Sequence, residues 1–236
     1  MRVEPHDVGS VMHIIKRGAR GLPIVRDDTD RKNFLLILYY LNTQHQDQNW
    51  RTTIERTSFP LWPTSWPERE PLIGLWAYTL MPNHFHLIVQ EIKEGGIAKF
   101  MQRLCGSMSA YANARYNEKG SLFQGGYKAR AVNDDADLRW LASYVMVKNT
   151  FELYPGGLSK AVKEFEKTWQ WGVEYNFSSM GAYGSGEFPP LIQKEGNLLR
   201  IFFKNAHDFK RDSKTMLEEY VQRHVSQERE KITLEK

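Results

Sequence analysis

Cysteine and long apolar runs are both scarce in this sequence. Cys105 is the only cysteine among 236 residues, which excludes an internal disulfide and a thiolate metal cluster and fits a reducing cytosol. No stretch approaches the roughly 20 apolar residues that a membrane span requires. The N-terminus, MRVEPHDVGS, lacks the basic and then apolar layout of a signal peptide. These absences predict a soluble cytoplasmic protein without a membrane partner.

The composition is ample for a packed core. Apolar residues make up 41% of the chain and aromatic residues 13%. Lysine and arginine exceed aspartate and glutamate by 32 to 28, and the sequence pI is about 9.0. This mild basic excess is compatible with a nucleic-acid partner, but many soluble proteins share it, so it does not establish one.

Residue patterns predict alternating strands and helices in the first two thirds of the chain. Strands are expected at 10–17, 72–80 and 84–92, with an extended piece at the end of 119–132. Helices are expected over RKNFLLILYYLN, over about 97–118, and from Asn133 or Asp134 onward. This order favours an α+β fold: an antiparallel sheet with helices packed on one side.

Three further segments interrupt or follow this pattern. Prolines in the second half of 43–70 indicate an irregular insertion, with Trp62 and Trp66 packing it down. Residues 174–190 are rich in glycine, serine and proline and are typical of a linker or surface loop. Residues 191–205 and 213–231 have helical patterns, which predict a mainly helical C-terminal extension.

The stretch MPNHFHLIV places His84 and His86 two residues apart in a predicted strand. Side chains two residues apart point to the same face of a strand, so both imidazoles can lie side by side while Phe85 points into the core. A His-x-His pattern by itself is more often a pair of half-buried histidines than a metal site. The neighbouring motifs therefore decide its interpretation.

Four motifs in a fixed order carry a resemblance to a known family. They are IIKRGARGLPIVRDDTDRKNFL, MPNHFHLIV, GSLFQGGYKARAV and a helix containing SYVMVKN. Together they resemble the REP-associated tyrosine transposases, a single-tyrosine branch of the HUH nucleases, in which U is a bulky apolar residue. The resemblance runs from about Val8 to Gly157.

The resemblance implies a ferredoxin-like (RRM-like) fold and a specific chemistry. His84, His86 and a polar side chain on the tyrosine helix would hold Mg²⁺ or Mn²⁺, which polarises a phosphate of single-stranded DNA. Tyr144 matches the family nucleophile, which forms a 5′-phosphotyrosine intermediate and strand-transfer products. Tyr116 and Tyr127 are its rivals.

The implied partner is single-stranded or hairpin DNA with palindromic repeats, and both a monomer and a homodimer stay open. The implied domains are a transposase domain at 1–160, with the insertion at 43–70, and an extension at 161–236.

The sequence departs from the family after the tyrosine. The family places Asn four residues later, followed by Pro, whereas here the fourth residue is Lys148, the fifth Asn149 and the sixth Thr150. In an α-helix, Lys148 would lie about 40° from Tyr144 and Asn149 about 140° away. A protonated lysine is a poor metal ligand, so Lys148 is assigned to stabilising the phenolate or the phosphate. Asn149 is the preferred third ligand if the helix tightens, bulges or ends there, with Gln124 as the alternative.

Basic residues between the histidines and Tyr144 favour a DNA partner. Positive side chains there would contact phosphates, and two aromatic residues among them would stack on bases or pack in the core. The predicted DNA-binding residues, including two near the first glycine turn, are Arg17, Arg20, Lys99, Arg103, Arg115, Lys119, Phe123, Tyr127, Lys128 and Arg130.

Two other functions remain open at this stage. The displaced Asn and the missing Pro favour a DNA-hairpin-binding protein that kept the fold and lost the chemistry. A replication-initiator-type nickase or a relaxase of the HUH class is the other. Relaxases place their tyrosine before the His pair and this chain is too short for an added helicase domain, so the transposase branch is preferred.

Overall fold

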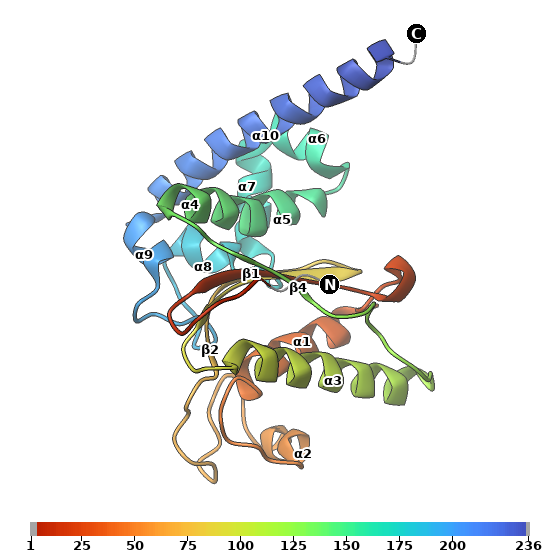
Figure 1. The fold of residues 1–236 in the computed structure, drawn as a ribbon, viewed down its shortest axis with the longest axis vertical. Coiled ribbons are helices and arrows are strands. Elements are labelled where there is room, and N and C mark those ends of the chain that lie inside the picture. The colour runs from red at the N-terminus through yellow and green to blue at the C-terminus, as the bar shows by residue number, and fades with distance from the viewer. Residues whose placement is uncertain (1–3, 235–236) are drawn as a thin grey trace. The chain divides into compact units, whose positions relative to one another are not determined.

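The computed structural model describes residues 4–234, with side chains described as far as Arg223. The chain forms two compact units (Figure 1). The first, here called the sheet unit, comprises Met1–Val132 and Phe188–Asn197; the second, the helical unit, comprises Asn133–Glu187 and Leu198–Lys236. Each unit is described by itself.

A four-stranded antiparallel sheet forms the centre of the sheet unit. Its strands are β1 (Val11–Arg17), β2 (Ile73–Leu80), β3 (His84–Glu91) and β4 (Lys128–Ala131), in the order β2-β3-β1-β4. With helices α1 (Asp28–Tyr40) and α3 (Gly96–Tyr116), the chain order is β-α-β-β-α-β, that of the ferredoxin-like fold. The predicted α+β class and antiparallel sheet are confirmed.

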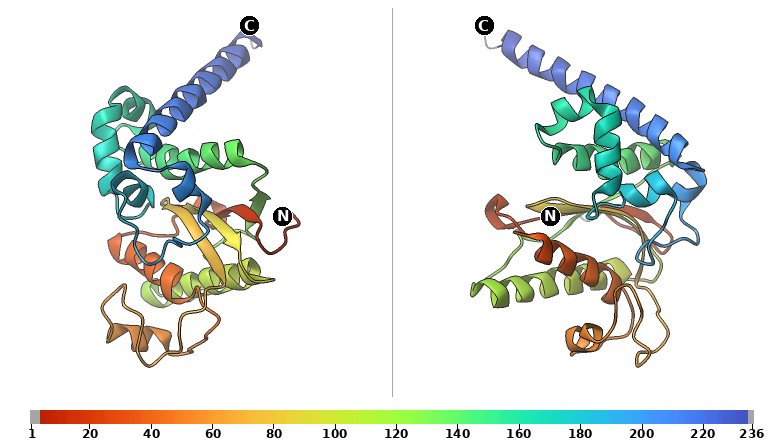
Figure 2. Two further views of the ribbon diagram at one scale, coloured as in Figure 1. Left: turned by 90° about the vertical axis from the view of Figure 1, so that its left-hand side faces the viewer. Right: turned by 180° about the vertical axis from the view of Figure 1, so that it is seen from behind.

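Both long helices of this unit cover the same face of the sheet (Figure 2). That face carries the side chains that alternate with the histidines, including Met12, Ile14 and Phe85, all fully buried. Phe34 of α1 packs against Phe85 with ring centroids 5.3 Å apart. The Glu91 carboxylate at the end of β3 accepts the amides of Gly96 and Ile97, both at 2.9 Å, and so caps the start of α3.

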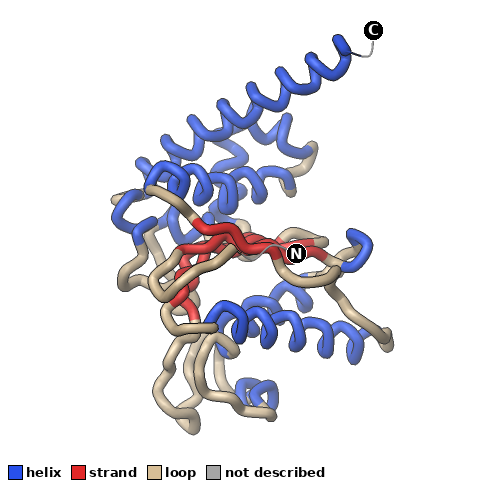
Figure 3. The backbone as a smooth tube through the Cα atoms, viewed as in Figure 1, coloured by secondary structure: helices blue, strands red, loops and turns tan. Residues whose placement is uncertain are grey.

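The insertion between α1 and β2 is held by aromatic packing. It contains the short helix α2 (Trp50–Glu55) and is otherwise loop (Figure 3). Trp62 and Trp66 lie 4.9 Å apart edge to face, and both rings also contact Tyr40 of α1. The packing of these half-buried rings anchors a segment that has little regular backbone hydrogen bonding of its own.

The helical unit begins with α4 (Asp135–Ser143), whose first turn is capped by the Asp134 carboxylate accepting the amide of Asp137. A π-helical turn follows at Tyr144–Lys148 and continues into α5 (Asn149–Glu152). The remaining helices are α6 (Gly157–Lys163), α7 (Phe165–Glu174), α8 (Met180–Ser185), α9 (Leu198–Phe202) and α10 (Ala206–Leu234).

Two expectations for the C-terminal third are wrong. Residues 191–197 are not helical, since Gly196 has a φ of +68° and the amide of Gln193 donates to the Leu75 carbonyl of β2 at 2.8 Å. The expected linker at 174–190 contains α8. Moreover, the compact units divide after Val132, so Tyr144 belongs to the helical unit; a functional boundary near 160 stays a prediction.

Candidate active site

His84 and His86 lie at the start of β3 and share one face of the sheet. Their ring centroids are 5.0 Å apart. His86 is 2% exposed, whereas His84 is half-buried. Across the neighbouring strand, Arg17 is paired with His84 and Ile15 with His86, so the exposed Arg17 lies on the same face as the imidazoles.

A hydrogen bond to Asn83 fixes the orientation of the His84 ring. The Asn83 amide nitrogen donates to the Gly21 carbonyl at 3.3 Å, so its Oδ1 is the atom that faces His84 Nδ1 at 2.7 Å. That oxygen can only accept, which places the hydrogen of His84 on Nδ1. The lone pair of its Nε2 is then the one suited to a metal ion.

The first glycine turn supports this arrangement through the backbone. The amide of Gly18 donates to the Asn83 carbonyl at 2.8 Å. A Cβ at Gly18 would lie 2.1 Å from the Leu22 carbonyl oxygen, so the turn requires glycine there. The motif GARGLP thus holds the residue that orients His84.

A third histidine, His13 of β1, was not among the predicted site residues. Its Nε2 lies 2.9 Å from Nδ1 of His86, and it is 8% exposed. Alternation along β1 places His13 on the imidazole face, but its proximity to His86 depends on the register between β1 and β3, which no local pattern reveals.

The π-helical turn changes which residue shares a side of the helix with Tyr144. The amide of Asn149 donates to the Tyr144 carbonyl, five residues earlier. In an α-helix the amide of each residue donates to the carbonyl four residues earlier, so this wider turn accommodates one extra residue. Asn149 therefore lies nearly one full turn from Tyr144, on its side of the helix. Of the three alternatives left open for this segment, the structure has the bulge.

Hydroxyl groups support the carbonyl oxygen inside this turn. The Met146 carbonyl accepts the Thr150 hydroxyl at 2.6 Å and the Ser178 hydroxyl at 3.4 Å. Such bonds compensate for backbone partners that a wide turn leaves out. Thr150, which stands where the family has Pro, thus contributes to the turn itself.

Asn149 is a buried amide with an unused hydrogen-bonding group. It is 1% exposed, and its Nδ2 has no hydrogen-bond partner among the described residues. A buried polar group without a partner is costly, by about 1–3 kcal/mol, and is commonly retained for a function.

Tyr144 lies in a cluster of rings within the helical unit. Its ring stacks on Trp140 at 5.3 Å with an interplanar angle of 12° and lies 6.1 Å from Tyr220. The Lys148 ammonium lies 4.9 Å from the centre of the Tyr144 ring and 2.6 Å from the Glu152 carboxylate. Burial acts to lower the pKa of Lys148, but the hydrogen bond to Glu152 and the electrostatic interactions with Tyr144, Glu152 and Tyr220 together outweigh it, and the pKa is raised. Lys148 is therefore a cation, not a metal ligand.

The described residues contain no group of three or more His, Cys, Asp or Glu side chains that could hold a metal ion. The histidine pair belongs to the sheet unit, and Tyr144 with Asn149 belongs to the helical unit. The arrangement thus offers two imidazoles in one unit, and a phenol, an ammonium and a buried amide in the other.

Comparison with known proteins shows a family that part of this chain resembles. Residues 70–148 match the family model described as "Transposase IS200 like", a segment that includes His84, His86 and Tyr144. The chain is similar to the IS200-like transposases. The expected resemblance is thereby confirmed, and the match supports a transposase function.

A solved structure is also similar to this chain. It is described as "REP associates tyrosine transposase bound to a REP hairpin" and has 10% sequence identity and a TM-score of 0.41, covering 82% of this chain and 92% of that one. None of the curated proteins with which the sequence was compared matches it. Within the described part of the chain, no helix is long and apolar enough to cross a membrane.

The predicted DNA-binding residues of this transposase-like chain differ in how accessible they are. The exposed ones are Arg17, Arg20, Lys99, Lys119 and Lys128. Arg103 donates to the Thr43 carbonyl at 2.5 Å, and Arg130 to the carbonyl of Ala131 at 3.1 Å.

The two aromatic residues of this set are less exposed. Phe123 is 4% exposed and packs edge-on against Phe85. Of the two roles left open for it, base stacking and core packing, its position fits core packing. Tyr127 is half-buried, and burial raises the pKa of its phenol.

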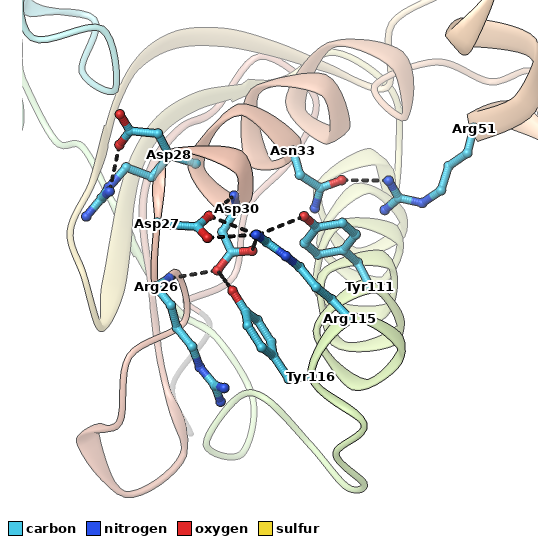
Figure 4. A network of polar contacts seen from close by, with 10 residues as sticks. Arg26, Asp27, Asp28, Asp30, Asn33, Arg51, Tyr111, Arg115 and Tyr116 are labelled. Atoms are coloured by element: carbon cyan, nitrogen blue, oxygen red, sulfur yellow. Dashed lines mark hydrogen bonds and ion pairs between the residues drawn. The ribbon is translucent and has the colours of Figure 1, made fainter.

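Arg115 belongs to a network that joins the ends of α1 and α3 (Figure 4). Its guanidinium contacts the carboxylates of Asp27, at 2.7 Å, and Asp30. These contacts lower the pKa of Asp27 to about 2. Burial, together with the hydrogen bond to Asp30, raises the pKa of Tyr116 to about 12. Arg115 thus has a structural role in addition to the DNA contact predicted for it.

Proposed function

We propose that the chain is a metal-dependent, single-tyrosine transposase that cuts and rejoins single-stranded DNA beside a hairpin. The π-helical turn supports this most, because it sets Asn149 on the Tyr144 side of the helix despite the extra residue between them. The displaced Asn was the main feature favouring a binding protein without chemistry. Because the π-helical turn compensates for the extra residue, the displaced Asn no longer argues against an enzyme.

The donors suit a divalent ion. His84 has its Nδ1 engaged by Asn83, so Nε2 is the ring nitrogen that would bind a metal, and Asn149, a buried residue, would bind it through its amide oxygen. We assign these two residues and His86 as the protein ligands of Mg²⁺ or Mn²⁺. Imidazole donors favour Mn²⁺, since Mg²⁺ prefers oxygen. When bound, such an ion polarises the scissile phosphate.

Tyr144 is assigned as the nucleophile. Its phenolic oxygen forms a bond to the phosphorus as it loses its proton, and the bond from phosphorus to the 3′ oxygen of the preceding nucleotide breaks. The departing 3′ oxygen takes up a proton. The product is a 5′-phosphotyrosine and a free 3′-OH, and attack by another 3′-OH on the phosphotyrosine rejoins DNA without an external energy source.

Lys148 is assigned to stabilising negative charge during this step. Its ammonium lies near the Tyr144 ring, and the raised pKa keeps it protonated at neutral pH. A fixed cation at this position stabilises the negative charge that develops as the phenol attacks the phosphate. Glu152 holds the ammonium in place through the 2.6 Å ion pair.

Covalent trapping tests this function. A single-stranded oligonucleotide containing a hairpin, taken from palindromes beside the gene and labelled at its 3′ end, is incubated with the protein and Mn²⁺. The expected result is a labelled protein band on a denaturing gel, which disappears with a chelator and with Tyr144→Phe. Tyr220→Phe is the matched control, since it changes a neighbouring ring of the same cluster, and it should keep the band.

A DNA-hairpin-binding protein that lacks the chemistry would give a different result. If the wild type binds the hairpin strands but forms no adduct with any of them, the chain is a DNA-hairpin-binding protein and the transposase proposal is wrong. Adduct formation that survives Tyr144→Phe would reassign the nucleophile to another tyrosine.

A further inference from the structure

The contact between His13 and His86 has the geometry of a directed hydrogen bond. The two ring planes differ by 15°, and the ring centroids lie 5.2 Å apart. That separation is close to the largest that two imidazoles joined by a 2.9 Å nitrogen–nitrogen contact can have. The rings therefore meet edge to edge, with His13 Nε2 and His86 Nδ1 pointing straight at each other. One nitrogen donates and the other accepts.

The strand pairing holds His13 in this position. His13 is paired with Ile88, and His86 with Ile15, so the two histidines are diagonal neighbours across the β1–β3 ladder. The residues flanking His13 in β1, Met12 and Ile14, are fully buried on the opposite face. A change of His13 would thus leave the core face of the sheet unaltered.

The direction of this hydrogen bond decides what His86 can do. If His13 donates, the hydrogen of neutral His86 lies on Nε2, which then cannot bind a metal ion. If His86 donates, its Nε2 carries a lone pair, as it does in His84, where Asn83 imposes the Nδ1–H form.

We propose that His13 is a positioning residue that accepts a hydrogen bond from Nδ1 of His86 and so keeps His86 Nε2 ready for a divalent ion. The inference rests on the proposed function for the identity of the ligand. The tautomer itself is a property of the metal-free protein, and it can be measured without any metal or DNA. His13 and Asn83 would then perform the same task for the two histidines, one from a neighbouring strand and one from the preceding turn.

Nitrogen NMR of the metal-free protein tests the tautomer. The protein is labelled with ¹⁵N in its seven histidines and recorded well above the ordinary imidazole pKa of about 6.5. His86 is assigned from the signal that is lost in His86→Gln. We expect wild-type His86 to carry its hydrogen on Nδ1. The same form is expected in His13→Gln, whose amide oxygen can accept.

His13→Phe removes the acceptor, so His86 should shift toward the Nε2–H form that free imidazole prefers in water. A wild-type His86 with its hydrogen on Nε2, or a His13→Phe spectrum unchanged at His86, would overturn the proposal. A thermal melt of each variant shows whether the fold is intact.

Mn²⁺ binding provides the second measurement. Loss of a partner that orients a metal-binding histidine typically weakens metal affinity about 10–100-fold. We expect a loss of that size in His13→Phe and an affinity near the wild-type value in His13→Gln. The control is His45→Phe, a histidine of the insertion whose ring contacts Trp66, and it should not change Mn²⁺ affinity.

His84→Ala separates the two proposals. If it abolishes Mn²⁺ binding while His13→Phe has no effect, the role of His13 is wrong and the proposed function stands. If neither variant changes Mn²⁺ binding, the proposed metal site is wrong, and the NMR result alone decides whether His13 sets the tautomer of His86.

Discussion

Deletion of Lys148 should leave the helical unit folded, although it removes a buried residue from the middle of a helix. Each residue of an α-helix turns the chain by about 100°, so a deletion ordinarily rotates every side chain beyond it out of place. The π-helical turn at Tyr144–Lys148 already holds one extra residue. Deletion of Lys148 should therefore turn this segment into a regular α-helix in which the residues before and after it keep their orientation. Asn149 would then stand four residues after Tyr144, as in the family.

The expected cost of this deletion is small. It removes the ion pair between Lys148 and Glu152. The buried lysine is the partner that is deleted, and the remaining Glu152 carboxylate is 36% exposed and stays hydrated, so we take about 1 kcal/mol for the pair. Adding the loss of the buried lysine stem, we expect a destabilisation of about 1–2 kcal/mol. For a chain of this size that corresponds to a melting temperature lower by about 2–8 °C.

A matched deletion in a regular helix should be far more damaging. Lys167 lies on the exposed side of α7, and its deletion would rotate Trp169 away from Phe165 and Phe209, whose ring centroids lie 5.8 and 5.4 Å from its own. Losing the packing of one such ring costs about 3–5 kcal/mol, a large part of the roughly 5–15 kcal/mol by which a domain is typically stable.

Circular dichroism melting curves of the two deletion variants and the wild type provide the comparison, with Mn²⁺ titration as a second readout. A Lys148 deletion that melts as low as the Lys167 deletion would refute the idea that the wide turn is a removable one-residue insertion. Loss of Mn²⁺ binding in a folded Lys148 deletion would refute the placement of Asn149 as a ligand.

Three other variants test separate parts of the structure. Lys148→Met should keep Mn²⁺ binding but slow adduct formation at least tenfold, which single-turnover gel assays measure; an unchanged rate would remove Lys148 from the chemistry. Because the folded pKa of Asp27, about 2, lies below its ordinary 3.8, its carboxylate stabilises the fold above about pH 4, and this contribution is lost as the pH falls toward 2. Asp27→Asn should therefore lower the urea midpoint at neutral pH and have little effect near pH 2, whereas an equal loss at both pH values would contradict the ion pair. Lys128→Ala should reduce the slope of log affinity for single-stranded DNA against log salt by about 0.7, while an unchanged slope would exclude a phosphate contact by this residue.

Much of the sheet unit follows from local sequence patterns. Alternation predicts β1 and β3, and apolar spacing predicts α3, because each of these elements buries one face against the same core. The motif MPNHFHLIV also predicts correctly that both imidazoles share a face. These features depend on residues close in sequence.

Features that depend on distant residues do not follow from such patterns. The proximity of His13 to His86 depends on strand register, and a carbonyl inside the π-helical turn accepts a hydroxyl from Ser178, more than thirty residues away. The apolar residues Leu191 and Ile192 suggested a helix, but they are buried in an irregular segment that pairs with β2 through Gln193. A buried loop and a buried helix have the same hydrophobic requirement, so composition does not separate them.

The identity of the nucleophile can be measured directly by mass spectrometry of the trapped adduct. Trypsin cuts after lysine and arginine, so Tyr144 falls on the peptide 140–148, Tyr127 on 120–128 and Tyr116 on 116–119, each with one tyrosine. After nuclease digestion of the bound DNA, we expect the mass of a nucleotide 5′-phosphate on peptide 140–148 alone. A nucleotide on either of the other two peptides, or on none, would contradict the assignment of Tyr144.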